Sequence, residues 1–222
     1  DSGIEWLGEV PKHWEVKKLK YFVGAILGGG TPSKNTPEYW IGEIPWVSPK
    51  DMKSDLISDS IDKISHKAIS ESSTSLIPKN SVLIVVRSGI LKHTIPVALN
   101  TVEVTLNQDM KAVIPKKCLK SEYLFFIIKG MQNELLTFTT KIGATVDSIE
   151  YEYLINFSIT LPPLQEQERI LSYIQKETHK IDNLISLAER EIMLFEEYRT
   201  ALINEAVTGK IDIRTNNEAN HV

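Results

Sequence analysis

Between Leu164 and Thr208 the chain contains no glycine or proline, and its apolar side chains recur every seven residues. A helix of about 45 residues would be about 68 Å long at 1.5 Å per residue, which is too long to bury its whole apolar stripe against a small lobe. A long amphipathic helix most often packs on its own domain, but this length and sevenfold spacing favour a seam between two helices. We therefore expect residues 161–210 to form one long helix of the coiled-coil type.

The apolar stripe of this predicted helix defines a dimerisation seam. With Leu171 at the a position of the heptad, the residues that we expect in the seam are Leu171, Ile174, Ile181, Ile185, Ala188, Ile192, Phe195 and Leu202. Thr178 and Arg199 also fall at a positions, where polar side chains weaken a seam but fix its register or orientation. Gly209 is a candidate C-terminal cap, and residues 211–222 form a polar tail.

The residues before the helix form short apolar runs separated by glycine, proline, serine and asparagine. Runs rich in β-branched residues predict strands at 14–23, 81–89, 94–100, 110–115 and 155–161. Helical character is found at 121–133 and 148–153, and Pro162 and Pro163 suit the first turn of the long helix. The sequence thus predicts an α+β fold, in which a globular mixed domain over residues 1–160 is followed by one long coiled-coil-type helix.

Bulk properties limit the compartment of the protein. Cys118 is the only cysteine, which excludes an intrachain disulfide and a cluster of thiolate metal ligands. The sequence has no run of about 18 apolar residues, and its first ten residues are acidic rather than basic and apolar. We therefore expect a cytoplasmic protein with no membrane partner and no signal peptide.

The sequence gives no support for catalysis. The segment from Gly24 to Thr31 has the spacing of a nucleotide-binding P-loop, but Gly30 stands where the lysine of that loop belongs. The five histidines lack the spacing of metal ligands, and Ser88 lacks the flanking glycine of a nucleophile elbow. We predict a protein that is not an enzyme and that needs no cofactor or metal of its own.

Net charge does not by itself indicate a nucleic-acid-binding protein, because the whole chain carries −4. Residues 161–222 contain 7 Lys/Arg and 11 Asp/Glu, which accounts for the entire excess of acid. Residues 1–160 are therefore neutral and can hold a basic face if their acids lie elsewhere.

Several loops of the N-terminal domain combine glycine with hydroxyl, amide and basic side chains. Such groups donate hydrogen bonds to phosphates, and arginine, asparagine and glutamine can read base edges. The candidate DNA-binding residues are Gly30, Thr31, Ser33, Lys34, Ser48, Lys50, Arg87, Ser88, Lys92, His93, Asn107, Gln108 and Lys141. On composition alone, ordinary surface turns are the better interpretation of these loops, because glycine-rich turns and scattered basic residues occur in most proteins.

An ordered set of motifs adds to this interpretation. In chain order the motifs are WLGEVPKHWEVKKLKYF, GGGTPS, EYWIGEIPWVSPKDM, VVRSGILKHTIPVALN, LNQDMKAVIP, KIGATVDSIE, LPPLQEQERI and ALINEAVTGKIDIR. Together they span nearly all of residues 1–213, and LPPLQEQ before a long helix is the most specific of them. In this set and order the chain resembles the target-recognition module of the specificity subunits of type I restriction-modification enzymes.

The resemblance implies that residues 1–160 bind a short half-site in the major groove of double-stranded DNA, while the long helix acts as spacer and dimerisation element. It also implies methyltransferase subunits as partners, which would supply S-adenosylmethionine and the catalytic residues, and it leaves open whether a restriction subunit joins. Complete specificity subunits hold two such modules, whereas this sequence holds one, so it is either a natural half-subunit or part of a longer chain.

In either case we expect a homodimer with antiparallel helices that reads an interrupted palindrome. Two other functions remain open. A coiled-coil scaffold whose lobe binds protein and not DNA would use the same helix, and a hydrolase or nuclease would rest only on the polar loops.

Overall fold

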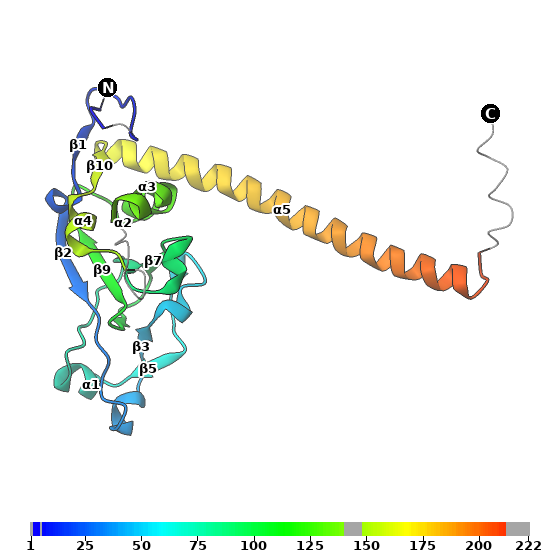
Figure 1. Cartoon of the computed structure of the whole chain (residues 1–222), viewed down its shortest axis with the longest axis horizontal. Coiled ribbons are helices and arrows are strands. Elements are labelled where there is room, and N and C mark those ends of the chain that lie inside the picture. The colour runs from blue at the N-terminus through cyan, green and yellow to red at the C-terminus, as the bar shows by residue number, and fades with distance from the viewer. Residues whose placement is uncertain (1, 5, 140–147, 212–222) are drawn as a thin grey trace. The chain divides into compact units, whose positions relative to one another are not determined.

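The computed structural model describes residues 2–4, 6–139 and 148–211, and its contacts divide the chain into two units, Asp1–Arg169 and Ile170–Val222. The first unit contains the strands and the short helices, and helix α5 (Leu164–Val207) starts in it and continues through the second unit. Helix α5 has 44 residues, and it is drawn as one continuous helix in Figure 1. The α+β prediction with a long C-terminal helix is confirmed. Gly209 follows with φ +71°, the left-handed conformation expected of a C-terminal cap.

A five-stranded sheet forms the centre of the first unit. Its strands lie in the order β2 (Val23–Gly28), β9 (Met110–Pro115), β6 (Val82–Val85), β7 (Val97–Asn100) and β4 (Leu56–Ile57). All neighbouring pairs run antiparallel except β4 and β7, which run parallel. The sheet therefore brings the end of β2, the start of β9, the end of β6 and the start of β7 to one edge.

Strand β6 is buried on both of its faces, as its unbroken Val-Leu-Ile-Val run predicts. Helix α2 (Ser121–Gly130) packs against β6, β7 and β9 through buried side chains that include Leu124 and Phe125. On the other face, Leu83 and Val85 belong to an apolar cluster that also contains Val47 and Leu106. This double burial makes β6 a rigid support for the loops at its ends.

A second sheet, not predicted from the sequence, lies beside the first. Its strands are β5 (Asp62–Ile64), β3 (Ile44–Val47) and β8 (Thr105–Leu106), and the 3-10 helix η2 (Pro37–Trp40) and helix α1 (His66–Glu71) pack on them. Strands of two to four residues are too short to show a period of two, and Pro45 within β3 argues against a strand in any sequence-based prediction.

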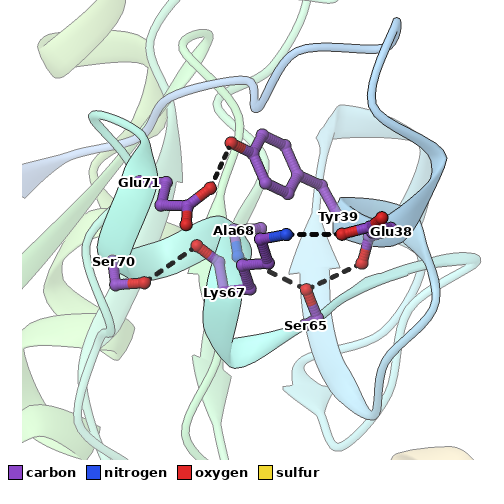
Figure 2. Close-up of polar contacts among 7 residues, drawn as sticks. All are labelled: Glu38, Tyr39, Ser65, Lys67, Ala68, Ser70 and Glu71. Atoms are coloured by element: carbon purple, nitrogen blue, oxygen red, sulfur yellow. Dashed lines mark hydrogen bonds and ion pairs between the residues drawn. The ribbon is translucent and has the colours of Figure 1, made fainter.

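Polar contacts fasten η2 to α1, as Figure 2 shows. The Lys67 ammonium pairs with the Glu38 carboxylate, and the Tyr39 hydroxyl donates to Glu71 Oε2 at 2.7 Å. The Lys67 contact lowers the pKa of Glu38, and the Glu71 contact raises the pKa of Tyr39. Ser65 caps α1, because its hydroxyl oxygen accepts from the Ala68 backbone N–H at 3.3 Å and its hydroxyl donates to the Glu38 carbonyl at 2.9 Å.

Two sequence predictions require correction near the chain ends of the first unit. The apolar run 14–23 is not one strand: β1 (Glu15–Lys18) pairs with β10 (Ser158–Leu161), and the 3-10 helix η1 (Leu19–Tyr21) separates β1 from β2. The helix expected from residue 148 begins only at Tyr151, where α4 (Tyr151–Asn156) starts, because the backbone of Ser148 forms an isolated bridge with Arg87. In the sequence, helix α3 (Gln132–Thr139) lies between α2 and Ser148.

The first turn of α5 is bonded to the N-terminal unit through the LPPLQEQ motif. Gln167 is fully buried: its side-chain oxygen accepts from the Lys120 N–H at 2.9 Å, and its amide nitrogen donates to the carbonyls of Cys118 and Pro162 at 2.8 and 2.9 Å. Glu166 accepts from the indole of Trp14 at 2.9 Å and contacts His13 at 2.7 Å, and these hydrogen bonds lower its pKa. The specific motif thus encodes the attachment of the helix.

None of the helices within the described residues is long and apolar enough to cross a membrane.

Candidate nucleic-acid interface

Four connections meet at one edge of the five-stranded sheet. Three of them belong to the strands of that sheet: residues 29–31 follow β2, residues 86–93 follow β6, and residues 107–109 precede β9. The fourth, residues 48–50, follows β3 of the second sheet. Strands β3 and β8 run parallel and end side by side, and the Asn107 N–H donates to the Val47 carbonyl at 2.9 Å. We call these four segments the loop edge. Most of the predicted DNA-binding residues lie on it, although they are scattered over some 80 positions of the sequence.

Asp109 lies at the centre of the loop edge. Its Oδ1 atom accepts from Arg87 Nε at 2.6 Å and lies 2.6 Å from Arg87 Nη2. Its Oδ2 atom accepts from the Asn107 amide at 3.2 Å, and its backbone N–H donates to Asn107 Oδ1 at 3.1 Å. The Asp109 carbonyl also accepts from the backbone of Val86 at 2.8 Å. The turn therefore joins two candidate residues, Arg87 and Asn107, through one carboxylate.

The glycine loop packs directly on this turn. The Gly30 N–H donates to the Leu106 carbonyl at 2.8 Å, and the Gly30 carbonyl accepts from the Trp46 indole at 2.9 Å. The Thr31 hydroxyl donates to the side-chain oxygen of Gln108. A Cβ atom at Gly29 would lie 1.8 Å from the Asn107 carbonyl oxygen, so only glycine allows this approach.

We expect Gly29→Ala to destabilise the chain by about 1–3 kcal/mol or more, because the added methyl group must displace backbone rather than a flexible side chain. Thermal unfolding followed by circular dichroism measures this loss. Gly89→Ala is the matched control, since its Cβ would meet nothing within 4 Å. Equal melting temperatures of the two variants would contradict the packing of Gly29 on Asn107.

The candidates after β3 differ in their surroundings. Ser48 is nearly buried, and both its backbone N–H and its hydroxyl donate to Asp51 Oδ2 at 2.8 Å, which caps the 3-10 helix η3 (Pro49–Asp51). The structure therefore gives the Ser48 hydroxyl a structural partner. Lys50 is exposed on η3 and available to a ligand.

The candidates after β6 lie on the 3-10 helix η4 (Gly89–Lys92) and at its ends. The Ser88 hydroxyl oxygen caps this helix by accepting from the Ile90 N–H at 3.4 Å. Lys92 and His93 are exposed at its last turn, and buried Leu91 anchors the helix to the core.

Ser33 and Lys34 lie on the part of the glycine loop that leads to η2. The Ser33 carbonyl accepts from the Trp40 indole at 3.2 Å. Lys34 borders an open pocket of about 500 Å³, whose lining is Lys34, Pro37, Trp40, Ile41, Trp46 and Asp62. Lys141 lies outside the described residues.

The sequence motifs do not single out two residues, Asp109 on the loop edge and Lys111 beside it on β9. Asp109 lies within the LNQDMKAVIP motif, but its bond to Arg87 links residues 22 positions apart, for which the sequence gives no signal. Lys111 is not among the candidate residues, although it pairs in register with Gly28 and Ile84, and its ammonium lies 5.5 Å from the centre of the Tyr151 ring. Its place directly after the NQDM turn is a signal that could have identified it.

The part of the chain that the structure describes contains no group of three or more His, Cys, Asp or Glu side chains arranged to hold a metal ion.

The predicted seam residues lie on α5. Leu171 is only 8% exposed. The large apolar seam residues from Ile181 onward are all exposed, and Phe195 reaches 70%. Outside the seam, α5 also exposes Leu187, Met193 and Leu194, which lie on a second side of the helix. A single partner helix on the seam would leave this second group uncovered.

Comparison with known proteins identifies the family of the chain. Residues 11–191 match the family described as "Type I restriction modification DNA specificity domain". The chain is 43% identical over 187 residues to the Escherichia coli "Type I restriction enzyme EcoR124I/EcoR124II specificity subunit", covering 82% of this chain and 46% of that protein. It is 33% identical over 180 residues to the MjaIX specificity subunit of Methanocaldococcus jannaschii, covering 80% and 40%.

Two solved structures share the fold. One, described as "Structural basis underlying complex assembly and conformational transition of the type I R-M system", matches with a TM-score of 0.72 at 22% identity over 90% of this chain and 47% of that chain. The HsdS subunit from Thermoanaerobacter tengcongensis matches with a TM-score of 0.63 at 20% identity, covering 80% and 40%. This protein spans about half the length of the relatives it matches, and it belongs to the DNA specificity domain family of type I restriction-modification systems.

Proposed function

We propose that this chain recognises a specific sequence of double-stranded DNA as a non-catalytic specificity subunit, with the loop edge placed in the major groove. The observation that carries the proposal is the convergence of Arg87, Asn107, Gln108 and Thr31 at one edge of a rigid sheet. Arginine and amide side chains are the groups that read base edges in the major groove.

Basic side chains at the same edge support contacts to the phosphate backbone. Lys50 and Lys92 are exposed, and within the described residues neither has an ion-pair partner. A lysine already paired with a carboxylate would offer less to a phosphate. Free ammonium groups on two neighbouring loops can each neutralise a phosphate and thereby set the register of the lobe on the duplex.

The exposed face of α5 supports the assembly that such a function needs. Pairing of the seam with a second copy through a two-fold axis would give two identical lobes, which read an interrupted palindrome. The second group of apolar side chains, Leu187, Met193 and Leu194, is then free to dock a methyltransferase subunit. We place the transfer of the methyl group on that subunit.

The first test joins the chain to its proposed partner and maps the product. Co-purification with a methyltransferase subunit, followed by sequencing of the methylated sites, is expected to give one interrupted palindromic motif. Assembly with partners but no salt-dependent affinity for duplex DNA would instead support a coiled-coil scaffold whose lobe does not bind DNA.

The lysines of the loop edge give a second measurement. In the double variant Lys50→Ala and Lys92→Ala, we expect weaker binding to all duplexes alike and a fall of about 1.8 in the slope of log affinity against log salt. The matched control is Lys79→Ala with Lys117→Ala, because these exposed lysines lie before β6 and after β9, at the opposite edge of the sheet. An equal loss in the control pair would contradict the placement of the interface.

A further inference from the structure

The contact between Arg87 and Asp109 leaves one end of the guanidinium unoccupied. Asp109 Oδ1 engages Nε and Nη2, which together form one side of the planar fork. Arginine has five N–H donors, so both hydrogens of Nη1 and the outer hydrogen of Nη2 remain available. These hydrogens point along the end of the side chain, which is the geometry that donates to two acceptors at once.

The carboxylate that holds this guanidinium is itself fixed. Asp109 Oδ2 accepts from the amide of Asn107, and Asn107 is only 6% exposed. The Asp109 carbonyl accepts from the backbone N–H groups of Val86 and Arg87 at 2.8 and 3.2 Å, which ties the turn to the end of β6. The Asp109 side chain is 23% exposed and that of Arg87 is 54% exposed. The partly buried Asp109 carboxylate therefore holds an Arg87 guanidinium whose free end is exposed.

This arrangement suits a base edge better than a phosphate. A carboxylate 2.6 Å from the guanidinium cancels much of its charge, and the carboxylate would repel a phosphate brought to the same place. A neutral pair of acceptors at the correct spacing suffers no such repulsion. In the major groove guanine presents this pair as its O6 and N7 atoms, which arginine binds with two parallel hydrogen bonds.

We infer that Asp109 is a positioning residue that holds Arg87 so that the free end of its guanidinium reads a guanine in the major groove. The inference rests on the proposed function and specifies its chemistry at one base pair of the half-site. Asp109 does not touch the DNA in this arrangement. It removes the rotamer freedom that Arg87 would otherwise lose on binding, so the arginine is preorganised for one base.

The test selects bound duplexes from a pool with a randomised central region, using the full chain together with its methyltransferase subunit. For the unsubstituted chain we expect a G·C preference at one base pair of each half-site. Arg87→Ala should reduce that preference about 5- to 100-fold and leave the other positions unchanged. Arg87→Lys should fail to restore it, because an ammonium group lacks the fork.

Asp109→Asn is the decisive variant. We expect it to weaken the preference at the same base pair as Arg87→Ala and at no other, and to have no further effect on specificity when Arg87 is already alanine. The comparison made in the Arg87→Ala background separates positioning from a general role in folding, because a folding defect would add to the effect of Arg87→Ala. Lys50→Ala should lower affinity for every duplex without changing the selected sequence.

Three outcomes would overturn the inference while leaving DNA recognition intact. In the first, Asp109→Asn selects the same sequences as the unsubstituted chain. In the second, Arg87→Ala changes the preference at a base pair that is not G·C. In the third, Arg87→Ala loses affinity for all duplexes alike, which identifies a phosphate contact. A chain that selects no sequence from the pool would overturn the proposed function itself, and the inference with it.

Discussion

Substitution of Ile185 and Ile192 by lysine is expected to convert the protein from a dimer into a monomer. Both side chains lie on the predicted seam, and both are more than half exposed on α5. Burial of an isoleucine contributes about 1.5–3 kcal/mol, and a two-fold seam counts each position twice. The four lost side chains therefore remove about 6–12 kcal/mol of association free energy, which raises the dissociation constant by a factor of about 10⁴ or more.

Sedimentation or light scattering at micromolar concentration measures this change directly. The unsubstituted chain should show twice the chain mass of 25.1 kDa, and the double variant should show the mass of one chain. Asn183→Lys with Asn204→Lys is the matched control, because it adds the same charge to the opposite side of the helix. A monomer before any substitution would refute the seam.

Because the double variant is expected to be a monomer, it should bind a complete two-part site more weakly than the unsubstituted chain does. Its binding to a single half-site should be unchanged. In the dimer the second lobe binds at a high effective concentration once the first has bound, and the monomer lacks this advantage. A duplex with one half-site scrambled separates the two effects.

The second large effect is expected at Gln167, whose replacement by methionine should lower the free energy of unfolding by about 2–4 kcal/mol. Methionine has a similar volume but offers no donor or strong acceptor, so the Lys120 N–H and the carbonyls of Cys118 and Pro162 lose their partner. A buried backbone group without a hydrogen bond costs about 1–3 kcal/mol, and partial access of water at two of these groups reduces the sum.

Urea unfolding followed by circular dichroism measures the loss of free energy, and in thermal unfolding the melting temperature should fall by about 5–15 °C. Gln165→Met is a close control, since it makes the same change two residues earlier on an exposed position of α5. If both variants were equally stable, the three hydrogen bonds of Gln167 would contribute nothing to the fold.

The elements that the sequence predicted correctly have a long periodic pattern or an apolar run with clear turn residues at its ends. The heptad repeat of α5 recurs along most of a helix of 44 residues, so its period is unambiguous. Strands β6, β7 and β9 contain apolar β-branched runs bounded by turn residues, and helix α2 begins at the predicted Ser121. In each case local composition and tertiary burial favour the same structure.

The predictions that failed depend on pairing between distant segments. The run 14–23 is divided into β1, η1 and β2, and β1 pairs with β10 some 140 residues later, while the Leu19 N–H donates to the carbonyl of Phe157. No local pattern reveals these partners. The candidate interface shows the same division. Its loops were located by their glycine and basic residues, but the carboxylate of Asp109 that organises them acts on Arg87 through space.

The burial of β6 on both faces has a consequence for how such a protein can change its target. The side chains that hold the scaffold together, such as Leu83 and Val85, are different residues from those that project at the loop edge, such as Arg87 and Gln108. Substitutions that alter which bases are preferred therefore need not disturb folding. Under the proposed function, new targets would become accessible through a few exchanges of exposed side chains in the connections, on a framework that those side chains do not hold together.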